Sequence, residues 1–320
     1  MAQGLLPVPT VLRSSKIALA LLMAFSASVI LFAAAGPRAA HAFARRCLYS
    51  RSLKFLHHAR SGGTRNLPAV IFWAWERPED LRFLTSDQAG VAFLAKTIYL
   101  QPPADPTGSP SFIVRPRLQP LRTTVGTPLI AVIRMETPAP PRLSSLQQNQ
   151  SALVAFAYSN AQRTLLASEI AGMQSISGVS SIQIDFDAPA SAHPFYAALL
   201  MDVRRKLPPR LPLSITALAS WCIGDPWLGQ LPPGTIDEAV PMLFRMGPDA
   251  GKVLKFLHSG DDFPVAACRG SLGLSTDETL SNDLLTTFRT FHPREKRVYV
   301  FAPRSWTPSA AQTILEELQP

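Results

Sequence analysis

The sequence predicts a single (β/α)8 TIM-type barrel that follows an N-terminal signal or anchor segment. Three observations favour this fold. Apolar runs of strand length recur along residues 67–320. Many of these runs are apolar on both faces, which is typical of parallel strands covered on both sides. Segments with helical character separate them, and eight such units in about 250 residues match the barrel.

The predicted strands are eight apolar runs. Each ends in polar or aromatic residues, which mark the carboxyl end of a strand and the loop that leaves it. In chain order the runs are Ala69–Trp75, Gly90–Leu100, Pro128–Glu136, Ser181–Ala188, Leu211–Trp221, Ala239–Met246, Phe263–Arg269 and Arg297–Phe301.

The predicted helices lie in the connections between these runs. They are Pro78–Leu84, Ser144–Ala171, Ala192–Leu207, Pro248–Leu257, Asp277–Phe288 and Pro308–Leu318. An open doubly wound sheet is the alternative fold for such an alternation. The barrel is favoured because no Gly-rich phosphate loop of the dinucleotide or P-loop type follows any of the runs.

Residues 1–42 have the layout of a secretory signal peptide. Arg13 and Lys16 precede an apolar run over residues 17–35, and Ala40-His41-Ala42 forms a small-x-small cleavage motif. The apolar run of 19 residues is also long enough to cross a bilayer uncleaved. We therefore expect either a cleaved signal or a retained anchor. The protein is then periplasmic or secreted, or held at the inner membrane by residues 17–35.

The positive charge of the chain is concentrated near its N-terminus. The formal net charge is +9, but nine basic residues precede residue 67 and no acid precedes Glu76. The remaining 22 basic and 22 acidic residues balance, so the pI near 9.9 does not indicate nucleic-acid binding by the barrel. We expect no nucleic-acid partner. Residues 43–66 are predicted to be a basic linker that attracts anionic lipid, which makes the membrane a partner of the N-terminal segment.

The basic linker conflicts with export, because positive residues after an apolar span tend to keep that side in the cytoplasm. A misassigned start codon is a second source of this conflict. The cleavage-like motif at residues 40–42 still favours export.

The run Ser181–Ala188 is the most informative part of the chain, because it carries two carboxylates within a strand. Alternate side chains of a strand share a face, so Gln183, Asp185 and Asp187 lie opposite the apolar side chains between them. An unpaired buried carboxylate is costly. The pattern therefore predicts either a functional site or a buried ion pair, and Arg134 on the preceding strand is the natural partner for Asp185.

Residues at the carboxyl ends of the strands are candidates for function, because barrel active sites lie there. All five tryptophans of the chain fall at these ends or just after them. The catalytic candidates are Asp187, Asp185, Glu136 and Glu76, with Asp277 and Glu278 as weaker ones. The substrate-binding candidates are Trp73, Trp75, Arg134, Trp221, Asp225, Trp227, Arg245 and Trp306.

Aromatic rings and carboxylates in a barrel mouth suit a poly- or oligosaccharide. Glycoside hydrolysis uses two carboxyl groups that flank the scissile bond. Asp187 lies nearest the strand end and is the predicted acid/base residue, while Asp185 orients it or raises its pKa by repulsion. Glu136 or Glu76 supplies the second carboxylate. These residues favour a hydrolase acting on glycosidic bonds.

Other interpretations of the same residues stay open. Asp185 can be a structural partner of Arg134, and the barrel can bind a carbohydrate without cleaving it. Asp185 and Asp187 can also hold Mg²⁺ or Ca²⁺ in a phosphodiesterase-like site; otherwise no cofactor is expected. No zinc-spaced His cluster, Gly-x-Ser-x-Gly motif or Cys–His pair is present in the sequence.

The cysteines Cys222 and Cys268 allow two interpretations. They form a disulfide in an oxidising compartment, or they are small buried core residues. The sequence does not determine the oligomeric state.

Four segments resemble a bacterial family, the domain of unknown function 3142. They are residues 72–81, 183–188, 213–222 and 240–247, and the resemblance covers most of residues 68–306. More remotely, Ile184–Asp187 looks like the acid-bearing fourth strand of chitinase-like glycoside-hydrolase barrels. Those enzymes carry an Asp-x-x-Asp-x-Asp-x-Glu run, whereas here Pro189 stands in place of the catalytic Glu. The resemblance implies a barrel with its site at this strand, without the substrate-assisted mechanism of those enzymes.

Overall fold

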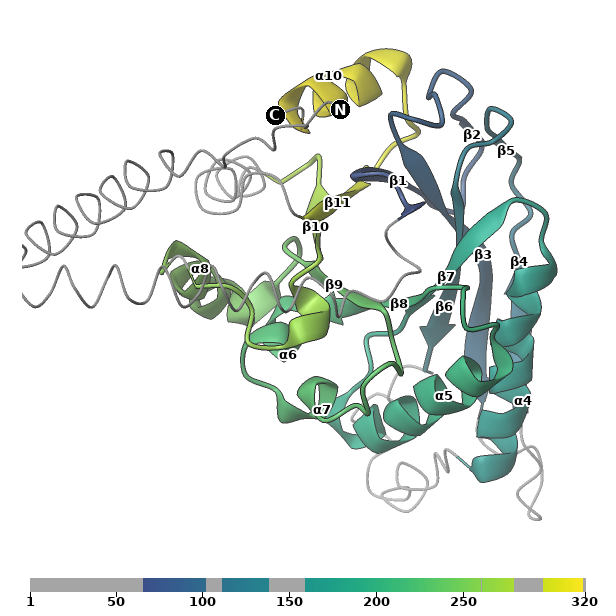
Figure 1. Ribbon diagram of the computed structural model, residues 1–320, viewed down its shortest axis with the longest axis vertical. Helices are drawn as coiled ribbons and strands as arrows, with labels where there is room; N and C mark the ends of the chain where they lie inside the picture. The colour runs from purple at the N-terminus through teal and green to yellow at the C-terminus, as the bar shows by residue number, and fades with distance from the viewer. Residues whose placement is uncertain (1–65, 102–110, 138–158, 260, 279–295, 319–320) are drawn as a thin grey trace, which may run out of the picture. The chain divides into compact units, whose positions relative to one another are not determined.

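The computed structural model describes residues 66–101, 111–137, 159–259, 261–278 and 296–318 (Figure 1). All of these residues belong to one compact unit, Ser61–Pro320. Among them, no helix is both long and apolar enough to cross a membrane. The predicted signal or anchor over residues 1–42 and almost all of the predicted linker lie outside the described residues.

Eight parallel strands close into a barrel. The order around the ring is β1-β11-β10-β9-β8-β7-β6-β3, and β3 pairs with β1 to complete it. This confirms the predicted fold class and rules out an open sheet. The barrel strands are β1 Val70–Ala74, β3 Gly90–Gln101, β6 Leu129–Glu136, β7 Val179–Asp185, β8 Leu213–Leu218, β9 Glu238–Met242, β10 Ser271–Ser275 and β11 Arg297–Phe301.

Helices lie in the connections from β6 to β10 and after β11. They are α4 Asn160–Ala171, α5 His193–Lys206, α6 Ala219–Ile223, α7 Pro226–Gly229, α8 Ala250–His258 and α10 Pro308–Leu318, together with the 3-10 turns η4 Gly172–Ser175, η5 Ala190–Ala192, η6 Gly247–Asp249 and η7 Ala266–Cys268. Ser159 caps α4 by accepting a hydrogen bond from the Gln162 amide. Three basic residues in the last turn of α5 complement its dipole. The helices α4 and α5 lie side by side outside the barrel (Figure 1).

The predicted helix Pro78–Leu84 is wrong. The short strand β2, Glu79–Asp80, forms there instead and pairs with β5, Leu121–Arg122. The amides of Glu79 and Leu81 donate to the carbonyls of Pro120 and Arg122. These bonds to a distant segment replace the hydrogen bonds that a helical turn would make.

The predicted strand Phe263–Arg269 is also wrong. It forms a loop and the turn η7, and the barrel strand β10 begins only at Ser271. Pro264 has no amide hydrogen to give to a sheet. The side chain of Arg269 donates to the carbonyls of Phe263 and Pro264, which holds the loop in place of strand pairing.

Four other predicted elements end early or lie partly outside the described residues. The run Leu211–Trp221 leaves the sheet after Leu218, where α6 begins. The run Ala239–Met246 leaves it after Met242. The predicted helices Ser144–Ala171 and Asp277–Phe288 lie partly outside the described residues, and the described part of the first contains α4.

The strand β3 has two special features, a hairpin strand that pairs with it and a bulge. The strand β4, Ser111–Pro116, pairs antiparallel with residues 96–101 of β3, beyond the residues that pair with β1, and corresponds to no predicted element. The register of β3 against β6 shifts between Leu94 and Lys96. A one-residue shift exchanges the faces of a strand. Lys96 therefore points out of the barrel and forms an ion pair with Glu169 of α4.

The lower half of the barrel interior is filled by side chains. Ile71, Ala92, Ile130, Val240 and Tyr299 form an apolar cluster that is separate from the core between strands and helices. Below it, the buried carboxylate of Glu238 accepts hydrogen bonds from Tyr299 and Arg297, at 2.7 and 2.5 Å. This packing closes the amino-terminal end of the barrel, so space remains only toward the carboxyl ends of the strands.

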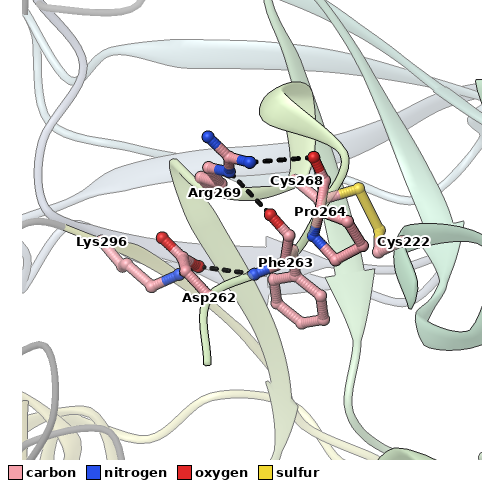
Figure 2. Close-up of a disulfide and its surroundings, with 7 residues drawn as sticks. All are labelled: Cys222, Asp262, Phe263, Pro264, Cys268, Arg269 and Lys296. Atoms are coloured by element: carbon pink, nitrogen blue, oxygen red, sulfur yellow. Dashed lines mark hydrogen bonds and ion pairs between the residues drawn. A yellow bond between two sulfur atoms is a disulfide. The ribbon is translucent and has the colours of Figure 1, made fainter. Parts of the chain in front are cut away.

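Cys222 and Cys268 form a disulfide that joins α6 to η7 (Figure 2). Of the two interpretations of these cysteines, the disulfide is therefore the one that the structure has. Close by, Lys296 forms an ion pair of 2.6 Å with Asp262, and its ammonium group lies over the ring of Phe263. The loop that precedes β10 is thus fastened both covalently and by charge.

Candidate active site

A cavity of about 240 Å³ lies at the carboxyl ends of the barrel strands. One wall is aromatic and consists of Trp73 and Trp75 from β1 and its end, Phe244 after β9, and Phe301 at the end of β11. Phe244 and Phe301 stack with ring centroids 5.8 Å apart, and Trp75 meets Phe301 edge-on at 6.2 Å. These rings form a continuous apolar surface inside the barrel mouth.

The opposite wall carries Asp185 and Asp187 at the end of β7 and Thr216 on β8. The Thr216 hydroxyl donates a hydrogen bond of 2.7 Å to Oδ1 of Asp185. The side chains of Asp185, Asp187, Thr216 and Arg134 all line the cavity. The alternation along the strand predicted that the two acids share one face. The two acids therefore face a common space with the aromatic wall across from them.

Burial raises the pKa of Asp185 to about 6. The hydrogen bond from Thr216 and the charge of Arg134 lower this pKa, and the negative charge of Asp187 raises it. Asp187 is exposed at the mouth, and partial desolvation raises its pKa while Arg134 opposes the shift. The two carboxyls thus have unlike surroundings although only one residue separates them.

Arg134 stands between the acids and the aromatic wall. Its guanidinium lies 5.4 Å from the centroid of Trp75, and its Nε forms an ion pair of 2.7 Å with Glu136 on the same strand. The predicted direct pair of Arg134 with Asp185 is absent from the described ion pairs, although the two residues are in register on neighbouring strands. Glu136 does not line the cavity and serves as the partner of Arg134 instead.

The floor of the cavity is a chain of hydrogen bonds across the barrel. The indole N–H of Trp73 donates to the Gln183 side chain at 3.0 Å, and the Gln183 amide donates to Ser214 at 3.3 Å. All three side chains are buried. The polar face of β7 is thus satisfied below the acids, which accounts for Gln183 in an otherwise apolar interior.

Arg117 holds the end of β1 that carries Trp75. Its guanidinium donates to the carbonyls of Ala74, Trp75 and Arg77, at 3.2, 2.5 and 2.6 Å. A planar group with five N–H donors can hold several carbonyls at once. The hairpin after β3 therefore fixes the backbone beside the aromatic wall.

Glu76 lies away from the cavity. Its carboxylate forms an ion pair of 3.1 Å with Arg115 of the β4 hairpin. Strand parity no longer holds beyond the end of β1 at Ala74, so the position of Glu76 could not be read from the pattern. The structure does not support it as a catalytic group.

Three of the predicted tryptophans do not reach the cavity. Trp221, Trp227 and Trp306 are buried, with 4, 8 and 5% of their surface exposed. The first two pack against His193 in a cluster beside α5. The indole N–H of Trp306 donates to the carbonyl of Trp73 from outside the barrel. None of these three rings lines the cavity.

Asp225 likewise has a local role. Its carboxylate accepts a hydrogen bond from the amide of Trp227 and so caps α7. The other oxygen lies 3.7 Å from Nδ1 of His193. Asp225 does not line the cavity.

Arg245 lies at the rim with its backbone in the left-handed region, at φ 51°. Its amide donates to both carboxylate oxygens of Glu278, at 2.9 and 3.1 Å. Its guanidinium lies 3.7 Å from Asp277 and 5.3 Å from the centroid of Phe301. Asp277 and Glu278, the weaker catalytic candidates, therefore hold Arg245 and do not line the cavity.

Phe244, Phe301 and Asp249 also line the cavity, although they were not among the predicted site residues. Phe301 had a usable signal, because it ends a predicted strand in the same way as Trp75. Asp249 had none, since it belongs to the turn η6 before α8. Among the described residues, no group of three or more His, Cys, Asp and Glu side chains is arranged to hold a metal ion.

Residues 125–240 match the family described as domain of unknown function (DUF3142). This confirms the predicted resemblance for that range, which contains Arg134, Asp185, Asp187 and Thr216, whereas Phe244 and Phe301 lie beyond it. No curated protein matches the chain. Among solved structures, the chain is similar to the chitinase domain of the spore coat protein CotE from Clostridium difficile. The identity is 11%, the match covers 75% of this chain and 67% of that one, and the TM-score is 0.35.

Proposed function

We propose that the cavity binds a glycan and that the protein hydrolyses a glycosidic bond there. The observation that carries this proposal is the pair of carboxyls Asp185 and Asp187, with unlike surroundings, opposite a wall of four aromatic rings. The apolar faces of sugar rings stack on such a wall, and sugar hydroxyls bond to acids and to Arg134. Two carboxyl groups beside one bond are the groups that glycoside hydrolysis requires.

We assign Asp185 the role of general acid. With its pKa raised to about 6, Asp185 keeps its proton in mildly acidic solution. Asp187 is the more exposed of the two acids. Two titratable groups whose surroundings separate their pKa values are suited to acid and base roles. This assignment departs from the expectation based on strand position alone, in which Asp187 is the acid/base residue and Asp185 orients it.

In the proposed reaction Asp185 gives its proton to the glycosidic oxygen while the bond between that oxygen and the anomeric carbon breaks. The oxygen of a water molecule forms the new bond to the anomeric carbon, either directly or after a covalent intermediate on Asp187. The proton released by the water passes to the pair of carboxyl groups, so that Asp185 is protonated again and ready for the next substrate. No cofactor takes part in this scheme.

We further propose that the substrate is an envelope or secreted polysaccharide and that the protein works outside the cytoplasm. The disulfide Cys222–Cys268 supports this, because disulfides persist in oxidising compartments. The signal-like layout of residues 1–42 supports it independently. Retention at the inner membrane by residues 17–35 is part of this proposal. Cell fractionation with thiol labelling tests it, and a reduced cytoplasmic protein would contradict it.

The central experiment measures reducing-end release and binding across a panel of envelope polysaccharides with the full chain. Asp185→Asn and Asp187→Asn are each expected to lower turnover at least 100-fold while binding persists. Asp261→Asn, an exposed carboxylate outside the cavity, is the matched control and should leave turnover unchanged. Circular dichroism establishes that all variants fold.

Other outcomes identify the competing functions. Binding without turnover in the wild-type protein, lost on changing Trp75 and not on changing Asp187, identifies a carbohydrate-binding barrel. Loss of activity with EDTA and recovery with Mg²⁺ or Ca²⁺ identifies a metal-dependent phosphodiesterase. Either outcome rejects the glycosidase proposal.

A further inference from the structure

Two arginines line the proposed glycan cavity, and neither gives or takes a proton in the proposed reaction. The guanidinium of Arg134 lies over Trp75, and that of Arg245 lies over Phe301, at 5.4 and 5.3 Å from the ring centroids. These two rings contact each other with centroids 6.2 Å apart. Both positive charges are therefore mounted on one continuous aromatic surface.

The carboxylate partners of the two arginines lie outside the cavity. Glu136 binds Nε of Arg134, and Asp277 lies 3.7 Å from Arg245, but neither acid lines the cavity. Among the described residues, the guanidinium of Arg245 donates no hydrogen bond, and that of Arg134 donates only through its contact with Glu136. Most of the ten N–H donors of the pair are thus available to a ligand.

Arg245 is held in a conformation that opposes its own backbone preference. A φ of 51° is costly for a residue with a Cβ atom, and glycine would adopt it freely. The carboxylate of Glu278 grips the amide of Arg245 from both oxygens, and Asp277 attracts its side chain. Strain that neighbouring groups maintain in this way is typical of functional positions.

A simpler interpretation is that both arginines are solvated surface charges. The exposure of Arg245 agrees with this interpretation, because 60% of its side chain is accessible. A solvated charge, however, needs neither a left-handed backbone nor two acids to hold it. Neither arginine lies within ion-pair distance of Asp185 or Asp187 among the described contacts. The charge of Arg134 still favours the ionised acids, but Arg245 has no such effect on them, so neutralising the catalytic pair does not explain Arg245.

We propose that Arg134 and Arg245 select glycans that carry an anionic substituent. Guanidinium groups bind carboxylate and sulfate oxygens through paired hydrogen bonds, and stacking on an aromatic ring fixes their orientation. The substrate class is therefore an acidic oligosaccharide, with either a uronate carboxylate or a sulfate ester near the sugar that stacks on Trp75 and Phe301. This inference rests on the proposed glycan binding and adds the charge of the substrate to it.

The test compares matched acidic and neutral ligands by titration calorimetry on the full chain at low temperature. One pair is tri-galacturonate and its carboxyl-reduced, neutral counterpart, and the other is dextran sulfate and dextran. We expect the wild-type protein to bind the acidic member of at least one pair about 10-fold more tightly, a preference that falls as salt is raised. The pair that shows the preference identifies which anion is recognised.

Variants then assign the preference to the two arginines. Arg245→Gln is expected to weaken acidic-ligand binding about 10-fold and to leave neutral-ligand binding unchanged. Arg134→Gln is expected to weaken acidic-ligand binding about 10-fold and neutral-ligand binding less, because Arg134 also bonds to sugar hydroxyls. Arg210→Gln, an exposed arginine outside the cavity, should change neither. Arg245→Gly is a second variant that relieves the backbone strain, so it separates loss of the charge from loss of folding.

Three results overturn the inference in different ways. Equal affinity of the wild-type protein for acidic and neutral members of both pairs rejects it while leaving glycan binding intact. If Arg245→Gln weakens the binding of the acidic and the neutral ligand equally, Arg245 contributes to the shape of the cavity and not to recognition of the anion. Absence of binding to any glycan, neutral or acidic, rejects the proposed function and this inference together.

Discussion

The hydroxyl of Thr216 donates a hydrogen bond of 2.7 Å to Oδ1 of Asp185 across the pairing of β8 with β7. The bond favours the ionised carboxylate, so it lowers a pKa that burial raises to about 6. Thr216 therefore limits how firmly Asp185 holds its proton. The strand register produces this contact, because Ile184 pairs with Ile215 and the next residues of the two strands meet.

Replacing Thr216 with Val is expected to raise the pKa of Asp185 further, because burial then acts without the opposing hydrogen bond. The titration of Asp185, followed by carbon-13 NMR of its carboxyl, should move to higher pH. Any activity that needs protonated Asp185 should extend to higher pH with it. Thr216→Ser keeps a hydroxyl and is the control. An unchanged titration in Thr216→Val would show that the bond has no effect on the proton.

Asp185→Asn is expected to stabilise the protein at neutral pH. The folded-state pKa of Asp185, about 6, lies above the ordinary value of 3.8, so the folded state binds the proton more tightly than the unfolded state. The contribution of Asp185 to the free energy of unfolding is thus fully present below pH 4 and is lost as pH rises through 6, by up to ~3 kcal/mol. Asparagine cannot ionise, so urea unfolding should show equal stability at pH 4 and a more stable variant at pH 7.5. A constant difference across this range would contradict the assignment.

Arg245→Gly and Arg245→Ala both remove the side chain but differ at the backbone. At φ 51° alanine keeps the strain and glycine does not, so the glycine variant should be more stable by about 1 kcal/mol. Chemical denaturation of the two variants measures this difference. At the exposed position Arg210 the same pair of substitutions serves as the control, since φ there is not positive. If the glycine variant is no more stable than the alanine variant, the backbone of Arg245 is not strained.

Removing the disulfide by Cys222→Ala and Cys268→Ala together is expected to lower stability by about 4 kcal/mol. The bridge closes a loop of chain with a sequence separation of 46, which restricts the unfolded state. The midpoint of guanidinium unfolding, with the wild-type protein measured oxidised and reduced, checks the effect. The reduced wild-type protein should match the double variant, and a loss below about 1 kcal/mol would indicate compensating structure in the unfolded chain.

The alternation of side chains along each strand made much of the barrel predictable from the sequence. Arg297–Phe301 forms a strand with the predicted bounds, and the run around Asp185 faces its acids inward as its alternation indicated. These predictions hold because parity and the common edge of parallel strands are properties of the backbone. They bring Arg134, Asp185 and Asp187 together without knowledge of any contact.

Residues beyond the strand ends could not be placed in the same way. The strand β8 ends at Leu218, three residues before the predicted end, and the helix that follows turns Trp221 into the cluster around His193. Glu76 turns to Arg115 on a hairpin strand that no sequence pattern indicated. Where a connection begins, side-chain direction depends on packing partners far along the chain, and periodicity contains no information about them.

The bridge between Cys222 and Cys268 also determines what one proteolytic cut can do to the barrel. A protease that cleaves between these residues, for example at the exposed end of α8 near His258, produces two fragments that remain one covalent molecule. The fragment with Asp185 and the fragment with Phe301 then stay tethered beside each other. In an oxidising compartment, where the bridge persists, Phe301 would therefore stay with the rest of the cavity after such a cut.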